Sequence, residues 1–99
     1  MSDLMNFTVY SRDGCPYCTK IQEVMQLAEL KHVIYKLDRD FDRPSFYSQF
    51  GQGSTFPQVV LNGDNLGGCT ETVQYLKENS LVWWKMILKM YMNWLNMPL

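Results

Sequence analysis

Two cysteines separated by two residues, Cys15 and Cys18, are the most reactive pair of side chains in the sequence. Turn-forming residues at 11–14 precede them, and Pro16 suits the first position of a helix, where a missing N–H costs nothing. The pair is therefore predicted at a strand-to-helix junction. A C-x-x-C motif in this place, within a β-α-β pattern, is typical of thiol–disulfide redox chemistry.

Cys15 is predicted to cap this helix, so its sulfur can accept hydrogen bonds from the backbone N–H groups of Tyr17 and Cys18. The positive end of the helix dipole also favours the thiolate, which is the nucleophilic form. A helix terminus supplies roughly 0.3–1 kcal/mol at an exposed site, less than one pKa unit, so a larger effect needs cations. The nearby charged side chains are two cations that favour the thiolate and one acid that opposes it: Arg12, Lys20 and Asp13.

The two cysteines are predicted to have different roles. Cys18 lies one helical turn beyond Cys15 on the same side, inside the first turn, so it should be less exposed and less acidic. We therefore assign Cys15 as the nucleophile and Cys18 as the thiol that resolves a mixed disulfide. The alternatives are two unrelated buried thiols or half of a zinc site, but zinc needs two more ligands and only Cys69 and His32 remain.

The elements that must position these cysteines follow from the hydrophobic pattern in the order β-α-β-α-β-β-α-α. The β-α-β start implies parallel strands with a right-handed crossover, and the closing hairpin adds an antiparallel pair. The fold class is therefore α/β with a mixed sheet. The expected strands are 6–10, 33–37, 57–61 and a return through Leu66 to 67–68, and the expected helices run from Pro16 to about 30, over 45–50, over 70–79 and from 81 onward.

Composition limits the class of protein. The chain has 99 residues, 46% hydrophobic and 19% charged, which suits one folded domain. A net charge of -1 argues against nucleic-acid binding. Three cysteines are too few and too odd in number for a disulfide-stapled secreted scaffold, and the N-terminus has no signal-peptide pattern. We therefore expect a cytoplasmic protein with reduced thiols.

The sequence resembles the glutaredoxin family, in its dithiol form, over about residues 5–80. Three motifs in the family's order carry the resemblance: Cys15-Pro16-Tyr17-Cys18, Thr55-Phe56-Pro57 and Gly67-Gly68-Cys69. The resemblance implies a thioredoxin-like fold, with a central mixed four-stranded sheet flanked by helices. It also implies a glutathione-dependent oxidoreductase that reduces protein disulfides and glutathione mixed disulfides. Glutathione is then a co-substrate, and no cofactor is tightly bound.

The same resemblance implies a glutathione groove beside Cys15. Tyr17 should flank this groove. The backbone of Thr55 and Phe56 should pair with the cysteinyl part of glutathione like an added strand, with Pro57 in the cis form. Gly68 should allow the chain to approach closely.

Charged parts of glutathione have their own expected partners. The N–H groups of Cys69 and Thr70, at a helix N-terminus, should hold the γ-glutamyl carboxylate. Arg12 matches the position of a basic residue for the other carboxylate. Many relatives carry a further basic residue before the Thr of the proline motif, where this chain has Ser54. Gln52 is expected to substitute for that residue by hydrogen bonding.

Two further expectations compete with simpler ones. Some glutaredoxin-like proteins hold a [2Fe–2S] cluster between two chains, which is the alternative function. Cys18 and Pro16 favour the enzyme, because the cluster-binding relatives mostly have Cys-Gly-Phe-Ser, and we expect no metal site. Cys69 could be a regulatory thiol, but a small side chain packed behind the glycines is favoured, since free cysteine is among the most buried residue types.

Residues 81–99 are expected to form a separate C-terminal helix after a domain at 1–80. Fourteen of these 19 residues are apolar, including all three tryptophans. Packing on the same domain is the first interpretation. A surface for a partner or for self-association is the second, because Met and Trp are typical of such surfaces. Lys85 and Lys89 interrupt a run that barely reaches the ~20 residues of a membrane span, so no span is expected.

Overall fold

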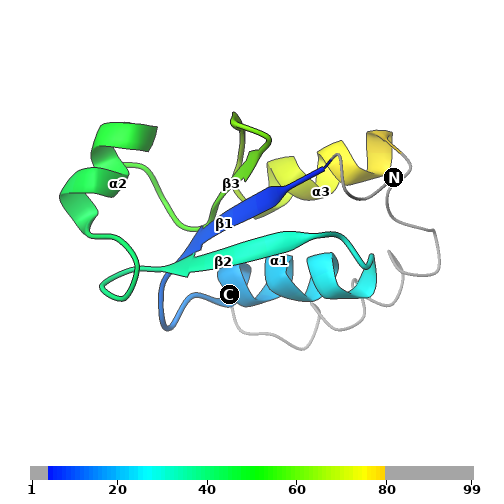
Figure 1. Cartoon of the computed structure of the whole chain (residues 1–99), viewed down its shortest axis with the longest axis horizontal. Coiled ribbons are helices and arrows are strands. Elements are labelled where there is room, and N and C mark those ends of the chain that lie inside the picture. Colours follow the sequence, from blue (N-terminus) through cyan, green and yellow to red (C-terminus); the bar gives the residue numbers. More distant parts are fainter. Residues whose placement is uncertain (1–4, 80–99) are drawn as a thin grey trace.

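Seven elements make up residues 5–79, the part of the chain that this computed structural model describes (Figure 1). None of the helices described there is both long enough and apolar enough to cross a membrane. In chain order the elements are β1 (Phe7–Ser11), α1 (Pro16–Leu27), β2 (His32–Lys36), α2 (Arg43–Phe50), β3 (Gln58–Leu61), β4 (Asp64–Gly67) and α3 (Cys69–Glu78).

The observed order matches the first seven predicted elements. The expected helix from 81 onward, and with it the division into 1–80 and 81–99, lies outside the described residues. Helix α2 begins earlier than the expected Ser45, because the carboxylate of Asp42 caps it by accepting the Ser45 N–H at 2.9 Å. Pro44 then occupies the first turn, where proline is tolerated.

The four strands form one mixed sheet in the order β2-β1-β3-β4, as expected. Strand β1 pairs in parallel with β2, from Phe7 beside His32 to Ser11 beside Lys36. It pairs antiparallel with β3, which in turn pairs antiparallel with β4. Because β1 and β2 run in parallel, their C-terminal ends meet at one edge, and the loop to Cys15 leaves from that edge (Figure 1).

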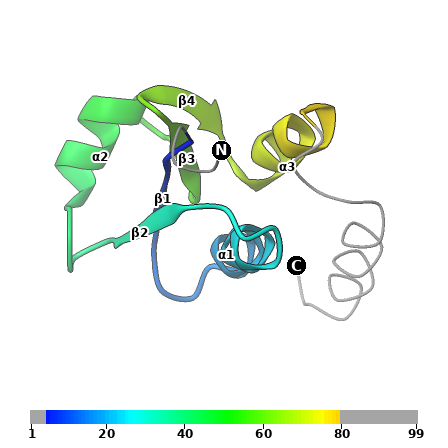
Figure 2. The same cartoon turned by 45° about the vertical axis from the view of Figure 1, so that its right-hand side comes forward.

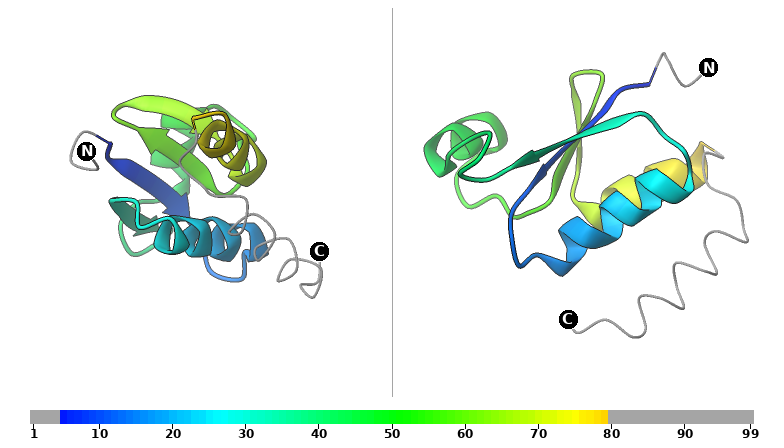
Figure 3. Two further views of the ribbon diagram at one scale, coloured as in Figure 1. Left: turned by 90° about the vertical axis from the view of Figure 1, so that its right-hand side faces the viewer. Right: turned by 60° about the horizontal axis from the view of Figure 1, so that its bottom comes forward.

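The helices lie on both faces of the sheet. Helix α2 is on one face, and α1 and α3 are on the other (Figure 2), where they lie side by side (Figure 3). Side chains alternate along β1, and its inward-facing residues Phe7 and Val9 are buried against α1 and α3. The main core lies between these layers: Phe7, Val9, Ile21, Val24, Met25, Val59, Leu61, Cys69 and Leu76.

A second cluster, composed of aromatic rings, packs α2 against the face of the sheet opposite to α1 and α3. The Phe46 ring stacks on Phe56 with centroids 4.2 Å apart and an interplanar angle of 13°. Tyr10 on β1 makes edge contacts with Phe41 and Phe50 at 5.3 and 5.0 Å. The cluster therefore joins α2, the sheet and the loop before β3, which carries Phe56.

Burial predicts that two valines on the neighbouring strands β1 and β2 contribute differently to the free energy of unfolding. Val9→Ala should lower the free energy of unfolding by about 2 kcal/mol, because a fully buried side chain loses its contacts and leaves a cavity. Val33→Ala, at a position that is 49% exposed, should cost less than about 1 kcal/mol. Urea unfolding of the two variants measures both values. Equal losses would contradict the placement of the core.

Candidate active site

The N-terminus of α1 presents a backbone donor to Cys15. Cys15 is the N-cap in an extended conformation, with φ -114° and ψ 102°, and Pro16 follows in the first turn. The Cys15 sulfur accepts the N–H of Cys18 at 3.2 Å. Of the two expected donors, the structure pairs the sulfur with Cys18 and not with Tyr17.

Cys15 and Cys18 form a disulfide with their Cα atoms 5.2 Å apart, so the structure is that of the oxidised protein. The exposed fraction is 7% for Cys15 and 1% for Cys18, which confirms the expected difference in access. The Thr19 hydroxyl also donates to the Cys15 carbonyl oxygen at 3.4 Å. Cys15 and Cys18 can therefore interconvert between a dithiol and a disulfide within the first turn of α1.

A groove of about 170 Å³ lies between the loop before β3 and the N-terminus of α3. The Phe56–Pro57 peptide bond in its wall is cis, as expected. The groove brings together all the predicted glutathione-binding residues except Arg12 and Gln52, and adds one acid. Its lining residues are Tyr17, Thr55, Phe56, Pro57, Gly68, Cys69, Thr70 and Glu71.

Arg12 and Gln52 lie outside this lining, but at different places. The Arg12 guanidinium is 5.9 Å from the centroid of the Phe56 ring, so it lies against one wall of the groove. Gln52 instead lines a separate depression over α2, together with Arg43. The Ser54 hydroxyl lies within 2.8 Å of two carbonyl oxygens at the end of α2, and this closes the intervening loop on itself. The structure therefore does not bring Gln52 to the groove.

The start of α3 depends on a glycine and an acid. Gly68 is the N-cap, and its N–H donates to Glu71 Oε1 at 2.8 Å. A Cβ at Gly68 would lie 3.0 Å from that oxygen and 3.4 Å from the Pro57 carbonyl, so only glycine fits without a shift. The N–H groups of the first turn, including Thr70, have no partner within the helix. They give this end of the groove donors for an anion.

Cys69 is packed and not poised to react. It is 5% exposed, and burial raises the pKa of its thiol to about 11, with the Glu71 carboxylate adding to the rise and Lys20 opposing it. The thiol is therefore protonated near neutral pH. This supports the packing interpretation over the regulatory one.

Lys20 is a buried cation at the groove side of α1. Only 3% of it is exposed, and its Nζ lies 4.5 Å from the centroid of the Tyr17 ring. The sequence identified Lys20 as a cation near the cysteines, but gave no sign of its burial. A cation held against an aromatic ring in this way keeps a positive charge beside the groove.

A second cavity, of about 420 Å³, borders both cysteines on the side of β2. Its charged lining residues include Arg12, Asp13, Lys36 and Arg39. Lys36 and Arg39 were not identified from the sequence. A signal existed, however, because a residue at the C-terminal end of β2 must lie at the same edge as the loop that leaves the parallel strand β1.

Within residues 5–79 no cluster of three or more His, Cys, Asp or Glu side chains is arranged to hold a metal ion. The described site consists of a disulfide, a cis-proline wall and a helix N-terminus. This combination, on a four-stranded mixed sheet, defines the thiol–disulfide oxidoreductases of thioredoxin-like fold.

The comparisons with known proteins identify the family. The sequence profile of the Glutaredoxin family matches residues 7–66. Glutaredoxin-C2 of Arabidopsis thaliana is 31% identical over 77 residues, covering 75% of this chain and 69% of that protein. The chain therefore belongs to the glutaredoxin family and is a thiol–disulfide oxidoreductase.

Solved structures agree with this fold. Glutaredoxin 1 from Francisella tularensis, crystallised with cacodylate, has a TM-score of 0.60 at 29% identity, covering 77% of this chain and 92% of that one. The buckwheat glutaredoxin–glutathione complex has a TM-score of 0.66 at 22% identity, covering 90% of this chain and 84% of that one.

The buried Cys69 thiol predicts a loss of stability at alkaline pH. In the oxidised protein, between the ordinary pKa of 9.0 and about 11, the folded chain keeps the Cys69 proton whereas the unfolded chain releases it. Stability should therefore fall as pH rises across this window, by up to roughly 1.4 kcal/mol per pH unit. Cys69→Ala removes this contribution.

Urea unfolding at neutral pH and across the same window measures the effect. The difference in unfolding free energy between the wild type and Cys69→Ala should decline as pH rises. A difference that stays constant with pH would contradict a buried, protonated thiol.

Proposed function

We propose that this glutaredoxin uses glutathione as its electron donor and reduces protein disulfides and glutathione mixed disulfides through Cys15 and Cys18. The observation that carries the proposal is the groove between the cis-proline loop and α3, which begins with Tyr17 beside the disulfide. The buckwheat relative, solved as a glutathione complex, supports the choice of ligand. A cytoplasmic location, where glutathione is kept reduced, is part of the proposal.

The chemistry of the groove suits the parts of glutathione. Cys69 and Thr70 line the groove, and we assign their first-turn N–H groups as donors to the γ-glutamyl carboxylate. Arg12, against the Phe56 wall, supplies a cation for the glycyl carboxylate. The Thr55 carbonyl already accepts the side-chain amide of Gln58 at 2.9 Å, so we assign the strand-like pairing with the cysteinyl backbone to Phe56.

The reaction begins from the reduced dithiol. The Cys15 thiolate attacks one sulfur of the substrate disulfide, forms a mixed disulfide, and expels the other sulfur as a thiolate that takes up a proton. Cys18 then loses its proton and attacks Cys15, which releases the substrate thiol and leaves the Cys15–Cys18 disulfide. One glutathione thiolate attacks Cys15, forms a mixed disulfide with it and releases the Cys18 thiol. A second glutathione thiolate attacks the glutathione sulfur of that mixed disulfide, which releases glutathione disulfide and restores the Cys15 thiolate. Two glutathione thiols are thereby oxidised for each disulfide reduced.

Substitution of the two cysteines separates their roles. Cys15→Ser should abolish turnover of both substrate classes, because no other thiol can start the exchange. Cys18→Ser should keep the reduction of glutathione mixed disulfides, which needs a single thiol, and lose the reduction of protein disulfides. A glutathione-coupled assay with each substrate measures both activities.

Retained turnover in Cys15→Ser would reject the assignment of the nucleophile. Loss of both activities in Cys18→Ser, in a variant that unfolds like the wild type, would reject the single-thiol route. The two variants serve as matched controls, because each removes one sulfur from the same turn of α1.

The role of Arg12 can be tested with a modified ligand. Arg12→Gln should raise KM for glutathione about tenfold, because a charge-assisted contact with the glycyl carboxylate is lost. It should barely change KM for the glycyl monoethyl ester, which has no charge at that end. Lys31→Gln, at an exposed position one residue before β2, is the control and should leave both constants unchanged. An equal rise of KM for the two thiols in Arg12→Gln would show that Arg12 does not contact this carboxylate.

A further inference from the structure

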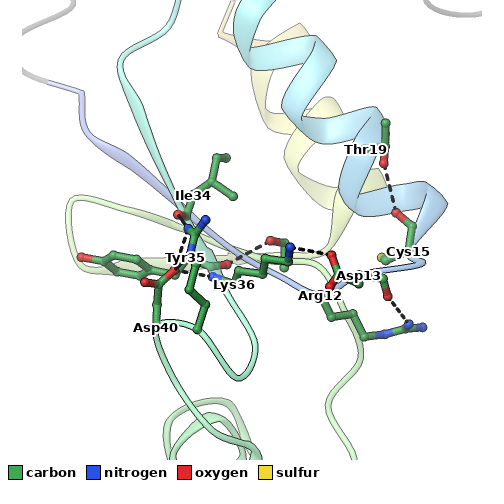
Figure 4. Close-up of polar contacts among 10 residues, drawn as sticks. Arg12, Asp13, Cys15, Thr19, Ile34, Tyr35, Lys36 and Asp40 are labelled. Carbon is green, nitrogen blue, oxygen red and sulfur yellow. Dashed lines mark hydrogen bonds and ion pairs between the residues drawn. The ribbon is translucent and has the colours of Figure 1, made fainter.

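An ion pair bridges the loop that carries Cys15 and the end of β2. Lys36 Nζ lies 2.7 Å from Asp13 Oδ1 (Figure 4). Asp13 is two residues before Cys15, and Lys36 is the last residue of β2. The two charges are therefore brought to the nucleophile's loop from different elements.

Both members of the pair share a cavity with the reactive sulfurs. The cavity of about 420 Å³ is lined by Asp13, Lys36, Cys15 and Cys18 among others. Asp13 is the one carboxylate among its lining residues in the described part of the chain. A carboxylate beside a thiol opposes ionisation of that thiol, and an ammonium beside it favours ionisation. Where the carboxylate and the ammonium are paired, their opposite effects on ionisation of the thiol cancel.

We propose that Lys36 is a positioning residue of the active site, which keeps Cys15 available as a thiolate by cancelling the carboxylate of Asp13. The inference rests on the proposed function, in which the Cys15 thiolate starts the exchange. It adds a residue from β2, outside the C-x-x-C motif and outside the groove, that sets the reactivity of the nucleophile.

Uncharged bonds hold the same two segments together, so the pair is not needed for their placement. The Leu37 N–H donates to the Ser11 carbonyl at 2.9 Å, and the Ser11 hydroxyl donates to the Tyr35 carbonyl at 3.0 Å. Within the loop, the Arg12 guanidinium donates to the backbone carbonyl oxygen of Asp13 at 3.1 Å and not to its carboxylate. Loss of the Lys36 charge should therefore change the electrostatics of the site more than its geometry.

Other charged groups surround Cys15 but do not replace Lys36. Arg39 lines the same cavity, but it is paired with Asp40 at 2.7 Å. Lys20 lies over the Tyr17 ring, on the groove side of α1. The groups that face the site from the packed elements are Arg12 and Asp13 in the loop, Lys20 in α1, Lys36 at the end of β2, Arg39 and Asp40 after it, and Glu71 and Cys69 in α3.

Exposure limits the size of the effect. The side chains of Asp13 and Lys36 are 85% and 37% exposed, so water screens both charges. A single screened charge in the cavity that a thiol borders shifts the ionisation midpoint of that thiol by roughly half a pH unit. The expected changes in Cys15 reactivity are therefore small, and matched variants are needed to measure them.

The test is a double-mutant cycle in a Cys18→Ser, Cys69→Ser background, where Cys15 is the one thiol. The pH dependence of alkylation by iodoacetamide gives the midpoint at which Cys15 ionises. Lys36→Met should raise this midpoint by roughly half a unit, and Asp13→Asn should lower it by a similar amount. The double variant should return close to the background value, and high salt should shrink both single shifts.

Lys31→Met, one residue before the opposite end of β2, is the matched control and should leave the midpoint unchanged. A merely structural role for the ion pair would move both single variants in the same direction, without recovery in the double variant. That pattern, or no shift in Lys36→Met, would overturn the proposal. Failure of Cys15 to react with iodoacetamide in the background protein would instead overturn the proposed function.

Discussion

The junction between β1 and α1 is the constraint on which the site depends. The sheet fixes the direction of β1, and the loop after it places Cys15 at the N-cap of α1, where its sulfur meets the Cys18 N–H. The same turn places Cys18 within disulfide distance. The junction between β1 and α1 therefore sets the positions of the nucleophile, the resolving thiol and the helix N-terminus. The groove adds the surroundings that a thiol ligand requires.

Two sides of the cysteine pair have different physical character. On one side the cis-proline loop and α3 form a narrow groove whose backbone donors suit an anionic peptide thiol. On the other side a larger cavity carries paired charges from the loop and from the end of β2. We propose that the first side governs which ligand is recognised, and that the second governs how readily Cys15 ionises. The sheet connects the two sides, because the loop that carries Cys15 follows β1 and the cis-proline loop of the groove precedes the neighbouring strand β3.

Much of this could be predicted from the sequence, because the signals are local. The C-x-x-C spacing, Pro16 and the turn-forming residues at 11–14 predicted the strand-to-helix junction and the cysteine pair. The resemblance supplied the groove and the cis form of Pro57, which spacing alone does not indicate. Gln52 failed to reach the groove because Ser54 closes its loop on the end of α2. The burial of Lys20 could not be predicted, because it depends on packing between α1 and elements distant in the chain.

Catalysis by this chain requires Cys15 to be an acidic thiol next to the groove that Tyr17 lines. Nuclear magnetic resonance of the reduced chain, labelled at the cysteine Cβ carbons, reports the ionisation of each thiol separately. The Cys15 thiol is expected to ionise below the ordinary thiol pKa of 9.0, and the Cys18 and Cys69 thiols above it. A Cys15 that stays protonated up to or beyond that value would contradict it.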